Sequence, residues 1–161
     1  MSASQTRDTG PRLARMRWWQ VEPVLALERR VFPEEPWTAG LFWSELGQVD
    51  TRHYLVALDR DAVVGYAGLC DHPDEAFVQT LAVDPDHRGS GVGTRLLEAL
   101  LAEAGRRGQT RVALEVRADN EAAQRLYARH GFRRTGVRRG YYGQGRTDAV
   151  EMTRTGDLPT T

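Results

Sequence analysis

Three consecutive segments between residues 76 and 105 constrain the fold more than any other part of the sequence. Residues Ala76–Val83 have the composition of a strand. A polar, glycine-rich stretch follows from Asp84 to Gly93. After it, apolar residues recur at helical spacing up to Gly105, namely Val92, Leu96, Leu97, Leu100, Leu101 and Ala104. A strand that leads through such a loop into an amphipathic helix predicts a protein that mixes strands with helices.

The loop between this strand and this helix has the features of an anion site. Gly89, Gly91 and Gly93 would let backbone N–H groups turn inward, and the start of a helix adds about half a positive charge. The loop lacks the Gly-Lys-Ser/Thr ending of a nucleoside-triphosphate loop, and it lacks the GxGxxG spacing of a dinucleotide fold. Taken alone, it fits a flexible turn that only starts a helix better than it fits a binding site.

The rest of the chain alternates between helical and strand patterns. Residues Thr110–Arg117 alternate as a strand does, with Val112, Leu114 and Val116 on one face and Glu115 on the other. The other expected elements are a strand at Met16–Gln20, helices at Glu22–Phe32, Thr38–Gly47 and from Asp119 or Asn120 to Gly131, and hairpins of His53–Leu58 with Ala62–Cys70 and of Arg133–Arg139 with Arg146–Thr153. This order predicts an α/β (α+β) domain.

The length of 161 residues suits one domain, which we expect over residues 16–154. Residues 1–15 and 155–161 are expected to be flexible tails. The chain shows no apolar stretch long enough to span a membrane, and its start lacks the pattern of a signal peptide. These features favour a cytoplasmic protein that does not contact membranes.

The single cysteine, Cys70, cannot form an internal disulfide, and four scattered histidines give no zinc spacing. We therefore expect no metal. All 22 basic residues are arginines and balance 22 acids, yet residues 125–146 hold seven arginines and no acid. That segment suits an anionic partner. Because no helix-turn-helix or zinc-finger spacing occurs, a phosphorylated cofactor or an acidic substrate is favoured over nucleic acid.

Several motifs in this order resemble the GCN5-related N-acetyltransferase superfamily over residues 16–154. They are Leu81-Ala82-Val83-Asp84-Pro85, Arg88-x-x-Gly91-x-Gly93, Leu114-Glu115-Val116-Arg117, Asn120, and Leu126-Tyr127 with Gly131-Phe132. Within the superfamily, three segments are similar to the bacterial ribosomal-protein-alanine N-acetyltransferases. These are Phe32 with Pro36-Trp37-Thr38, the run from Leu114 to Asn120, and Arg138-Arg139-Gly140-Tyr141-Tyr142 followed by Asp148-Ala149 and Met152.

The resemblance implies a mixed, mostly antiparallel sheet that is split by a bulge and flanked by about four helices. Acetyl-CoA, the implied co-substrate, would lie in the gap between the third and fourth long strands. Its pantetheine arm would pair with the backbone of Leu81, Ala82 and Val83 and meet the amide of Asn120, which is equally well placed as a helix N-cap. Its pyrophosphate would lie on Arg88, Gly89, Ser90, Gly91, Val92, Gly93 and Thr94.

The resemblance also implies the chemistry. Glu115 matches the base that removes a proton from the attacking amine, and Tyr127 matches the acid that protonates the leaving thiolate. The backbone N–H of Val83 would stabilise the developing oxyanion. The plainer alternatives are a solvated strand carboxylate for Glu115 and a core tyrosine for Tyr127. We expect Cys70 to be a small buried apolar residue rather than a nucleophile.

The implied acceptor is the N-terminal α-amine of a protein, in particular a small-subunit ribosomal protein that begins with alanine. Tyr141 and Tyr142 would wall a narrow slot, and Arg138 would meet acidic residues behind the first position. Two alternatives remain open. One is an acetyltransferase for a small amine, such as an aminoglycoside or polyamine, and the other is a non-catalytic acyl-CoA-binding regulator. The tyrosine pair favours acetylation of a protein N-terminus over acetylation of a small amine, and the presence of both Glu115 and Tyr127 argues against a regulator.

Overall fold

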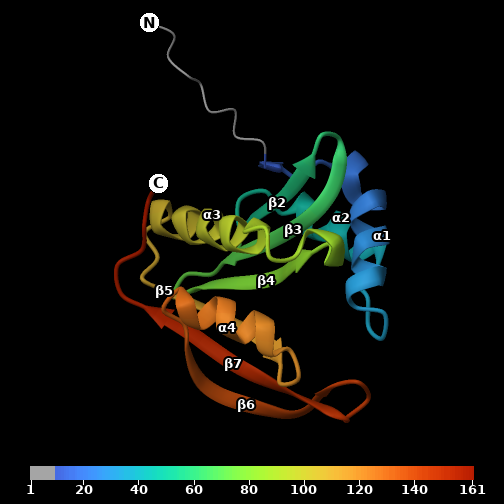
Figure 1. Cartoon of the computed structure of the whole chain (residues 1–161). Coiled ribbons are helices and arrows are strands. Elements are labelled where there is room, and N and C mark those ends of the chain that lie inside the picture. Colours follow the sequence, from blue (N-terminus) through green and yellow to red (C-terminus); the bar gives the residue numbers. More distant parts are fainter. Residues whose placement is uncertain (1–9) are drawn as a thin grey trace, which may run out of the picture.

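The computed structural model describes residues 10–161 and consists of one twisted sheet with helices on both faces (Figure 1). The sheet has seven strands in the order β1-β2-β3-β4-β5-β7-β6, and every neighbouring pair is antiparallel except β4 with β5. The strands are β1 (Arg12–Arg15), β2 (Arg52–Asp59), β3 (Ala62–Asp71), β4 (Ala76–Val83), β5 (Arg111–Arg117), β6 (Arg133–Tyr142) and β7 (Thr147–Thr155). The helices are α1 (Val21–Val31), α2 (Ala39–Gly47), α3 (Val92–Arg106) and α4 (Glu121–Arg129), with 3-10 turns η1 (Trp18–Gln20) and η2 (Pro85–His87).

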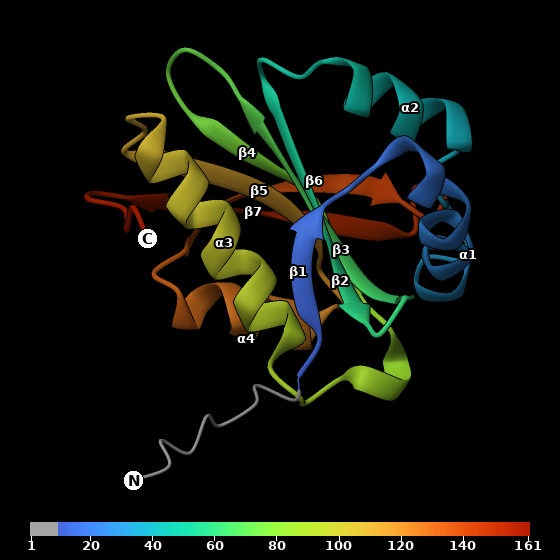
Figure 2. The same cartoon turned by 90° about the horizontal axis from the view of Figure 1, so that it is seen from above.

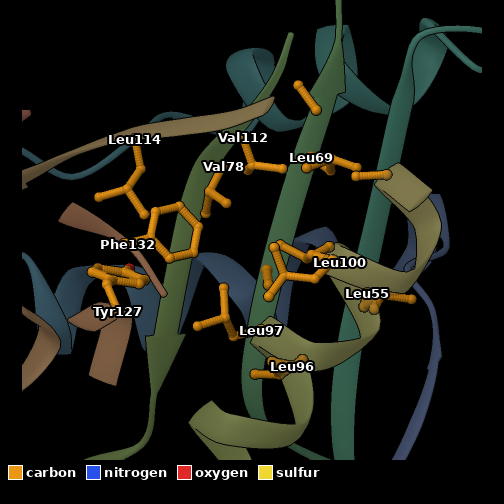
Figure 3. Packing of buried hydrophobic residues seen from close by; sticks show 14 of the residues in the cluster. Leu55, Leu69, Val78, Leu96, Leu97, Leu100, Val112, Leu114, Tyr127 and Phe132 are labelled. Atoms are coloured by element: carbon orange, nitrogen blue, oxygen red, sulfur yellow. The ribbon is translucent and has the colours of Figure 1, made fainter. Parts of the chain in front are cut away.

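The helices cover the sheet in two pairs, with α1 and α2 on one face and α3 and α4 on the other (Figure 2). Each pair has its own apolar core. The core under α3 joins Leu96, Leu97 and Leu100 to strand residues such as Leu55 and Leu69 (Figure 3). The core under α1 and α2 contains Val24, Phe42, Tyr54 and Tyr66, among others. Burial of both faces explains why the residues of β2 and β3 are almost all buried instead of alternating.

The sheet splits between β4 and β5. These two parallel strands pair only at Ala76–Val112, Phe77–Ala113 and Val78–Leu114. The split coincides with an irregularity in the β3–β4 ladder, where Gly68 faces Thr80 but Leu69 faces Val78, so that Gln79 is the extra residue of a bulge. A bulge bends its strand, so β4 departs from β5 directly after Val78. The expected mixed, mostly antiparallel sheet with a bulge and four flanking helices is confirmed.

Both ends of the chain differ from what the sequence suggested. The first strand is Arg12–Arg15, which pairs with β2 inside the expected N-terminal tail, whereas the expected strand at Met16–Gln20 is replaced by the turn η1. β1 adds to the edge of β2 through backbone pairing. Its two arginines made this segment look like a polar tail in the sequence. In the expected C-terminal tail, Leu158 packs against the α3 core and the carbonyl of Thr160 accepts a hydrogen bond from Arg106. Most of the expected N-terminal tail, residues 1–9, lies outside the described residues.

The β6–β7 hairpin is longer than the sequence suggested, because β6 continues beyond Arg139 to Tyr142 and β7 continues to Thr155.

No helix within residues 10–161 is both long enough and apolar enough to cross a membrane.

Candidate active site

A cavity of about 380 Å³ lies where β4 and β5 diverge. Its walls come from α1, the α1–α2 connection, β4, β5, α4 and the end of β6. Five residues expected from the sequence to form the site line this one cavity: Leu81, Glu115, Asn120, Tyr127 and Tyr142. Residues that are up to 61 positions apart in the chain, from Leu81 to Tyr142, therefore meet around one space.

One wall of the cavity is a strand edge whose backbone groups face the gap. Beyond Val78, β4 has no ladder partner on the β5 side. The N–H of Asp84 donates to the carbonyl of Val64 on β3 at 2.8 Å, and hydrogen-bonded pairs alternate along an antiparallel ladder. Ala82 therefore pairs with β3, while the backbone groups of Leu81 and Val83 point the other way. The gap thus offers a free strand edge to an extended ligand.

The glycine-rich loop continues this edge into α3. Gly89 and Gly91 have φ of +79° and +86°, and a Cβ built at either position would meet nothing within 4 Å. Gly91 is the N-cap of α3 and supplies no side-chain hydrogen bond, so the first-turn N–H groups from Val92 to Thr94 have no side-chain cap. Open space in front of uncapped helix N–H groups fits a phosphate group. In the same loop, Arg88 is exposed and the Ser90 hydroxyl donates to the carbonyl of His87.

Glu115 lies on β5, and its side chain is 16% exposed. It faces Glu151 directly across the β5–β7 ladder, a like-charged pair that destabilises a sheet unless a cation separates it. Arg138 on β6 supplies this cation, because its Nε lies 3.2 Å from Glu115 Oε1 and 3.0 Å from Glu151 Oε1. The arginine expected to meet the substrate is therefore paired with two glutamates of the protein.

Tyr127 is a buried residue of α4 whose ring packs 5.7 Å from that of Phe132 (Figure 3). Burial raises the pKa of its phenol, and Tyr142 raises it further, so the group stays protonated at neutral pH. Asn120 lines the same cavity and also caps α4, because its Oδ1 accepts a hydrogen bond from the Ala123 N–H at 3.1 Å. The helix-capping role of Asn120 is thus present alongside its place in the cavity wall.

The tyrosine pair lies at the far end of β6, with its ring centroids 4.9 Å apart in an edge-to-face arrangement. Tyr141 is about half exposed and lies over the Arg138 guanidinium, whereas Tyr142 lines the cavity with Arg117 over its ring. Burial, with the charge of Glu115, raises the pKa of Tyr142 to about 12. Only Tyr142 is therefore part of the cavity wall.

The wall opposite β5 is the α1–α2 lip (residues 32–37), whose residues Phe32, Pro36 and Trp37 belong to a family-like motif but were not expected to line the site. Five of its residues line the cavity, namely Phe32, Pro33, Glu34, Glu35 and Trp37. Glu34 forms an ion pair with Arg117 at 3.4 Å, and Glu35 accepts a hydrogen bond from the Gly143 N–H at 2.9 Å. The signals in the sequence were the motif of Phe32 with Pro36-Trp37-Thr38 and the pair of prolines, which mark a break between two helices but do not indicate where the break packs.

Two further observations concern other kinds of chemistry. Cys70 is buried, and burial raises the pKa of its thiol, which favours an inert apolar role over a nucleophilic one. Within residues 10–161, no group of three or more His, Cys, Asp or Glu side chains is arranged to hold a metal ion.

Comparison with known proteins gives a consistent result. The sequence model of the acetyltransferase (GNAT) family matches residues 14–132. The chain is 43% identical over 133 residues to N-alpha-acetyltransferase RimI of Mycobacterium tuberculosis, which covers 80% of this chain and 82% of that protein. It is also 40% identical over 119 residues to the ribosomal protein bS18-alanine N-acetyltransferase of Salmonella typhimurium. That match covers 73% of this chain and 79% of the relative.

A solved structure agrees with these sequence relatives. The crystal structure of the ribosomal-protein-S18-alanine N-acetyltransferase from Escherichia coli matches with a TM-score of 0.82 and 31% identity, covering 91% of this chain and 94% of that one. The split sheet, the open β4 edge and the uncapped start of α3 are thus found in a chain whose sequence and fold both point to one family. The protein belongs to the acetyltransferase (GNAT) family and is an acetyltransferase.

Proposed function

We propose that this protein transfers an acetyl group from acetyl-CoA to the N-terminal α-amine of a protein, in particular a ribosomal protein that begins with alanine. The Salmonella typhimurium and Escherichia coli relatives are named ribosomal protein bS18-alanine N-acetyltransferases, which supports this substrate. The observation that carries the proposal is that Glu115 and Tyr127 line one cavity beside a free strand edge. That arrangement combines an amine-activating carboxylate, a phenol donor and a binding edge for an extended ligand.

The residues around the gap fit acetyl-CoA. The backbone of Leu81 to Val83 can pair with the extended pantetheine arm, and the N–H groups from Gly89 to Thr94 can receive its phosphates. Arg88, exposed beside this loop, adds a positive charge for the same anion. When bound, acetyl-CoA supplies an acetyl group activated as a thioester.

Glu115 acts as the base in this proposal. An α-ammonium has a pKa of about 7.7–8.0, close to neutral pH. The base that removes its proton therefore need not be strong, and a carboxylate close to the amine suits this role. Arg138 holds the Glu115 carboxylate at 3.2 Å and keeps it apart from Glu151, which fixes its orientation toward the cavity wall. The N–H of Val83 points into the gap, which supports its role as the donor to the oxyanion.

Tyr127 acts as the donor to the leaving sulfur. Its raised pKa keeps the hydroxyl protonated, and its buried ring leaves the side chain little freedom to move. A thiol has a pKa of about 8.5, so a protonated phenol beside the sulfur stabilises the departing thiolate by hydrogen bonding. Asn120 lines the same cavity, which supports a contact of its amide with the pantetheine arm.

The acceptor enters between the α1–α2 lip and the end of β6. Tyr142 and Phe32 line this part of the cavity, which favours a small first side chain such as that of alanine. Tyr141 is about half exposed and packs edge to face on Tyr142, outside the cavity lining. Arg138 contributes to acceptor binding through its hold on Glu115, because its guanidinium is occupied by two carboxylates.

A competition assay tests the proposed function. Three peptides are offered together with acetyl-CoA: one beginning with alanine, one beginning with leucine, and one with a blocked N-terminus and a free lysine. We expect the alanine peptide to be acetylated fastest, because a lysine amine has a pKa of about 10.4 and a long flexible stem. Faster acetylation of the blocked lysine peptide would overturn the assignment.

A further inference from the structure

Glu28 is a buried carboxylate that the proposed chemistry does not use. It lies on α1, is 2% exposed, and borders the cavity from behind the α1–α2 lip. One carboxylate oxygen, Oε1, accepts a hydrogen bond from the backbone N–H of Trp37 at 3.0 Å. The other, Oε2, accepts one from the hydroxyl of Tyr66 on β3. The residue therefore joins the end of the lip to the centre of the sheet.

Aromatic contacts close this connection into a ring. The ring of Trp37 lies 5.2 Å from that of Phe42 on α2, and Phe42 lies 5.8 Å from Tyr66 in an edge-to-face arrangement. Phe42 and Tyr66 are fully buried. The chain of contacts from Glu28 through Trp37, Phe42 and Tyr66 returns to Glu28. Because each member is held from two sides, the position of Trp37 is fixed relative to β3.

The outer part of the lip reaches across the entrance of the cavity. Glu34 contacts Arg117 at the end of β5, and Glu35 contacts the backbone of Gly143 between β6 and β7. Glu34 and Glu35 are both exposed side chains. The Glu34–Arg117 ion pair joins an exposed to a half-buried side chain, and such a pair is individually weak, whereas the Glu35 carboxylate accepts its hydrogen bond from the buried backbone of Gly143. The buried attachment at Glu28 is thus the firm end of the lip, and the outer contacts depend on it for their alignment.

We propose that Glu28 is a positioning residue that fixes the α1–α2 lip and so sets the width of the acceptor slot and its preference for a small first residue. This inference rests on the proposed function, because it needs the acceptor to enter beside the lip. Removal of the carboxylate leaves the Trp37 N–H and the Tyr66 hydroxyl without their partner, so the lip loses its buried attachment. A looser lip holds the acceptor less well and discriminates less by size.

The test compares Glu28→Ala with Glu28→Gln, Tyr66→Phe and a matched control, Glu45→Ala. Glu45 is a similarly buried glutamate, 8% exposed, on the neighbouring helix α2; it pairs with Arg52 and does not line the cavity. Glutamine keeps an acceptor for the Trp37 N–H, and its amide can donate to the Tyr66 hydroxyl. For each variant, we would measure the melting temperature, KM for acetyl-CoA, KM for the alanine peptide, and the ratio of kcat/KM between alanine and leucine peptides.

We expect Glu28→Ala to raise KM for the alanine peptide about tenfold and to lower the alanine-to-leucine ratio about threefold or more, with KM for acetyl-CoA within about twofold of wild type. Tyr66→Phe, which removes only one hydroxyl, should change the same two quantities by a smaller factor. Glu28→Gln should retain most of the preference for the alanine peptide over the leucine peptide. Glu45→Ala should lower the melting temperature and leave both peptide quantities unchanged.

The inference is wrong if Glu28→Ala and Tyr66→Phe change only the melting temperature, as the control does. If Glu28→Ala does not fold, Tyr66→Phe decides by the same two peptide quantities: a change from wild type supports the inference, and no change overturns it. A wild-type protein that acetylates no free peptide N-terminus would instead overturn the proposed function, so the two failures give different results.

Discussion

Replacement of Gly91 by valine separates the ligand-binding role of the glycine-rich loop from its effect on stability. Gly91 has a φ of +86°, which a side chain adopts at a cost of about 1–2 kcal/mol, but a Cβ there would meet nothing within 4 Å. The substitution therefore strains the backbone without a clash. In a chain of 161 residues, this cost lowers the melting temperature by roughly 2–8 °C and leaves a folded protein.

The effect of Gly91→Val on binding should be larger than this strain suggests. Gly91 is the N-cap of α3, so we expect a valine side chain there to crowd a phosphate that approaches the uncapped N–H groups of the first turn. A hydrogen bond to a charged group contributes about 1.5–3 kcal/mol, so the loss of one phosphate contact raises the Kd for acetyl-CoA about 10- to 150-fold. Calorimetric titration with acetyl-CoA measures this change directly.

Gly108→Val is the matched control. Gly108 lies just beyond the other end of α3, has a φ of +81°, and also has nothing within 4 Å of a built Cβ. The two variants should lose similar stability in thermal denaturation, and only Gly91→Val should lose affinity. Equal affinities for the two folded variants would refute the assignment of the loop to the phosphates.

Three further predictions concern the proposed base, the proposed acid and a buried histidine. Glu115→Gln should lower kcat about 10²- to 10⁴-fold and recover partly as the pH rises through the pKa of the substrate amine, about 8; a pH–rate profile parallel to that of wild type would argue against a base. Tyr127→Phe should lower kcat by a similar factor, with KM for acetyl-CoA changed only a few-fold in steady-state kinetics, because the ring that packs against Phe132 is kept. Burial lowers the pKa of His53 to about 4 from an ordinary value of 6.5, so the unfolded chain binds this proton more readily than the folded one. The contribution of neutral, buried His53 to the free energy of unfolding is therefore fully present above pH about 6.5, and it is lost as the pH drops toward 4, by up to about 3 kcal/mol. The melting temperatures of wild type and His53→Gln, measured between pH 7.5 and 4.5, should converge as the pH falls, and a constant difference would contradict this reasoning.

Much of the fold follows from local patterns in the sequence. The helix after the glycine-rich loop is expected to end near Gly105 and runs over Val92–Arg106, and Thr38 caps α2 as expected by accepting a hydrogen bond from the Leu41 N–H at 3.2 Å. Such features depend on residues three or four positions apart, so they are readable from the chain itself. The first strand was misplaced because a four-residue edge strand has too few residues to show a period.

The side-chain pairings within the site could not be predicted from such local patterns. No local pattern indicates that Glu115 faces Glu151, because the register between β5 and β7 depends on how the whole β6–β7 hairpin docks against β5. Arg138 is consequently held between these two carboxylates, whereas its position in an arginine-rich segment suggested a free cation for an acidic substrate. Charge composition indicates how many partners a residue could have, and only the register decides which of them it meets.

The sequence by itself determined the class of the fold, the glycine-rich start of α3 and the presence of a carboxylate and a phenol at positions that match an acetyltransferase. Only the tertiary structure decided that the strands part after Val78, that the α1–α2 lip closes the other side of the cavity, and that the buried Glu28 holds this lip. The physical reason is distance along the chain. Helix periods, caps and glycine turns are set by neighbouring residues, whereas the cavity wall forms from elements such as α1 and β5, which are far apart in the chain and meet only in the folded domain.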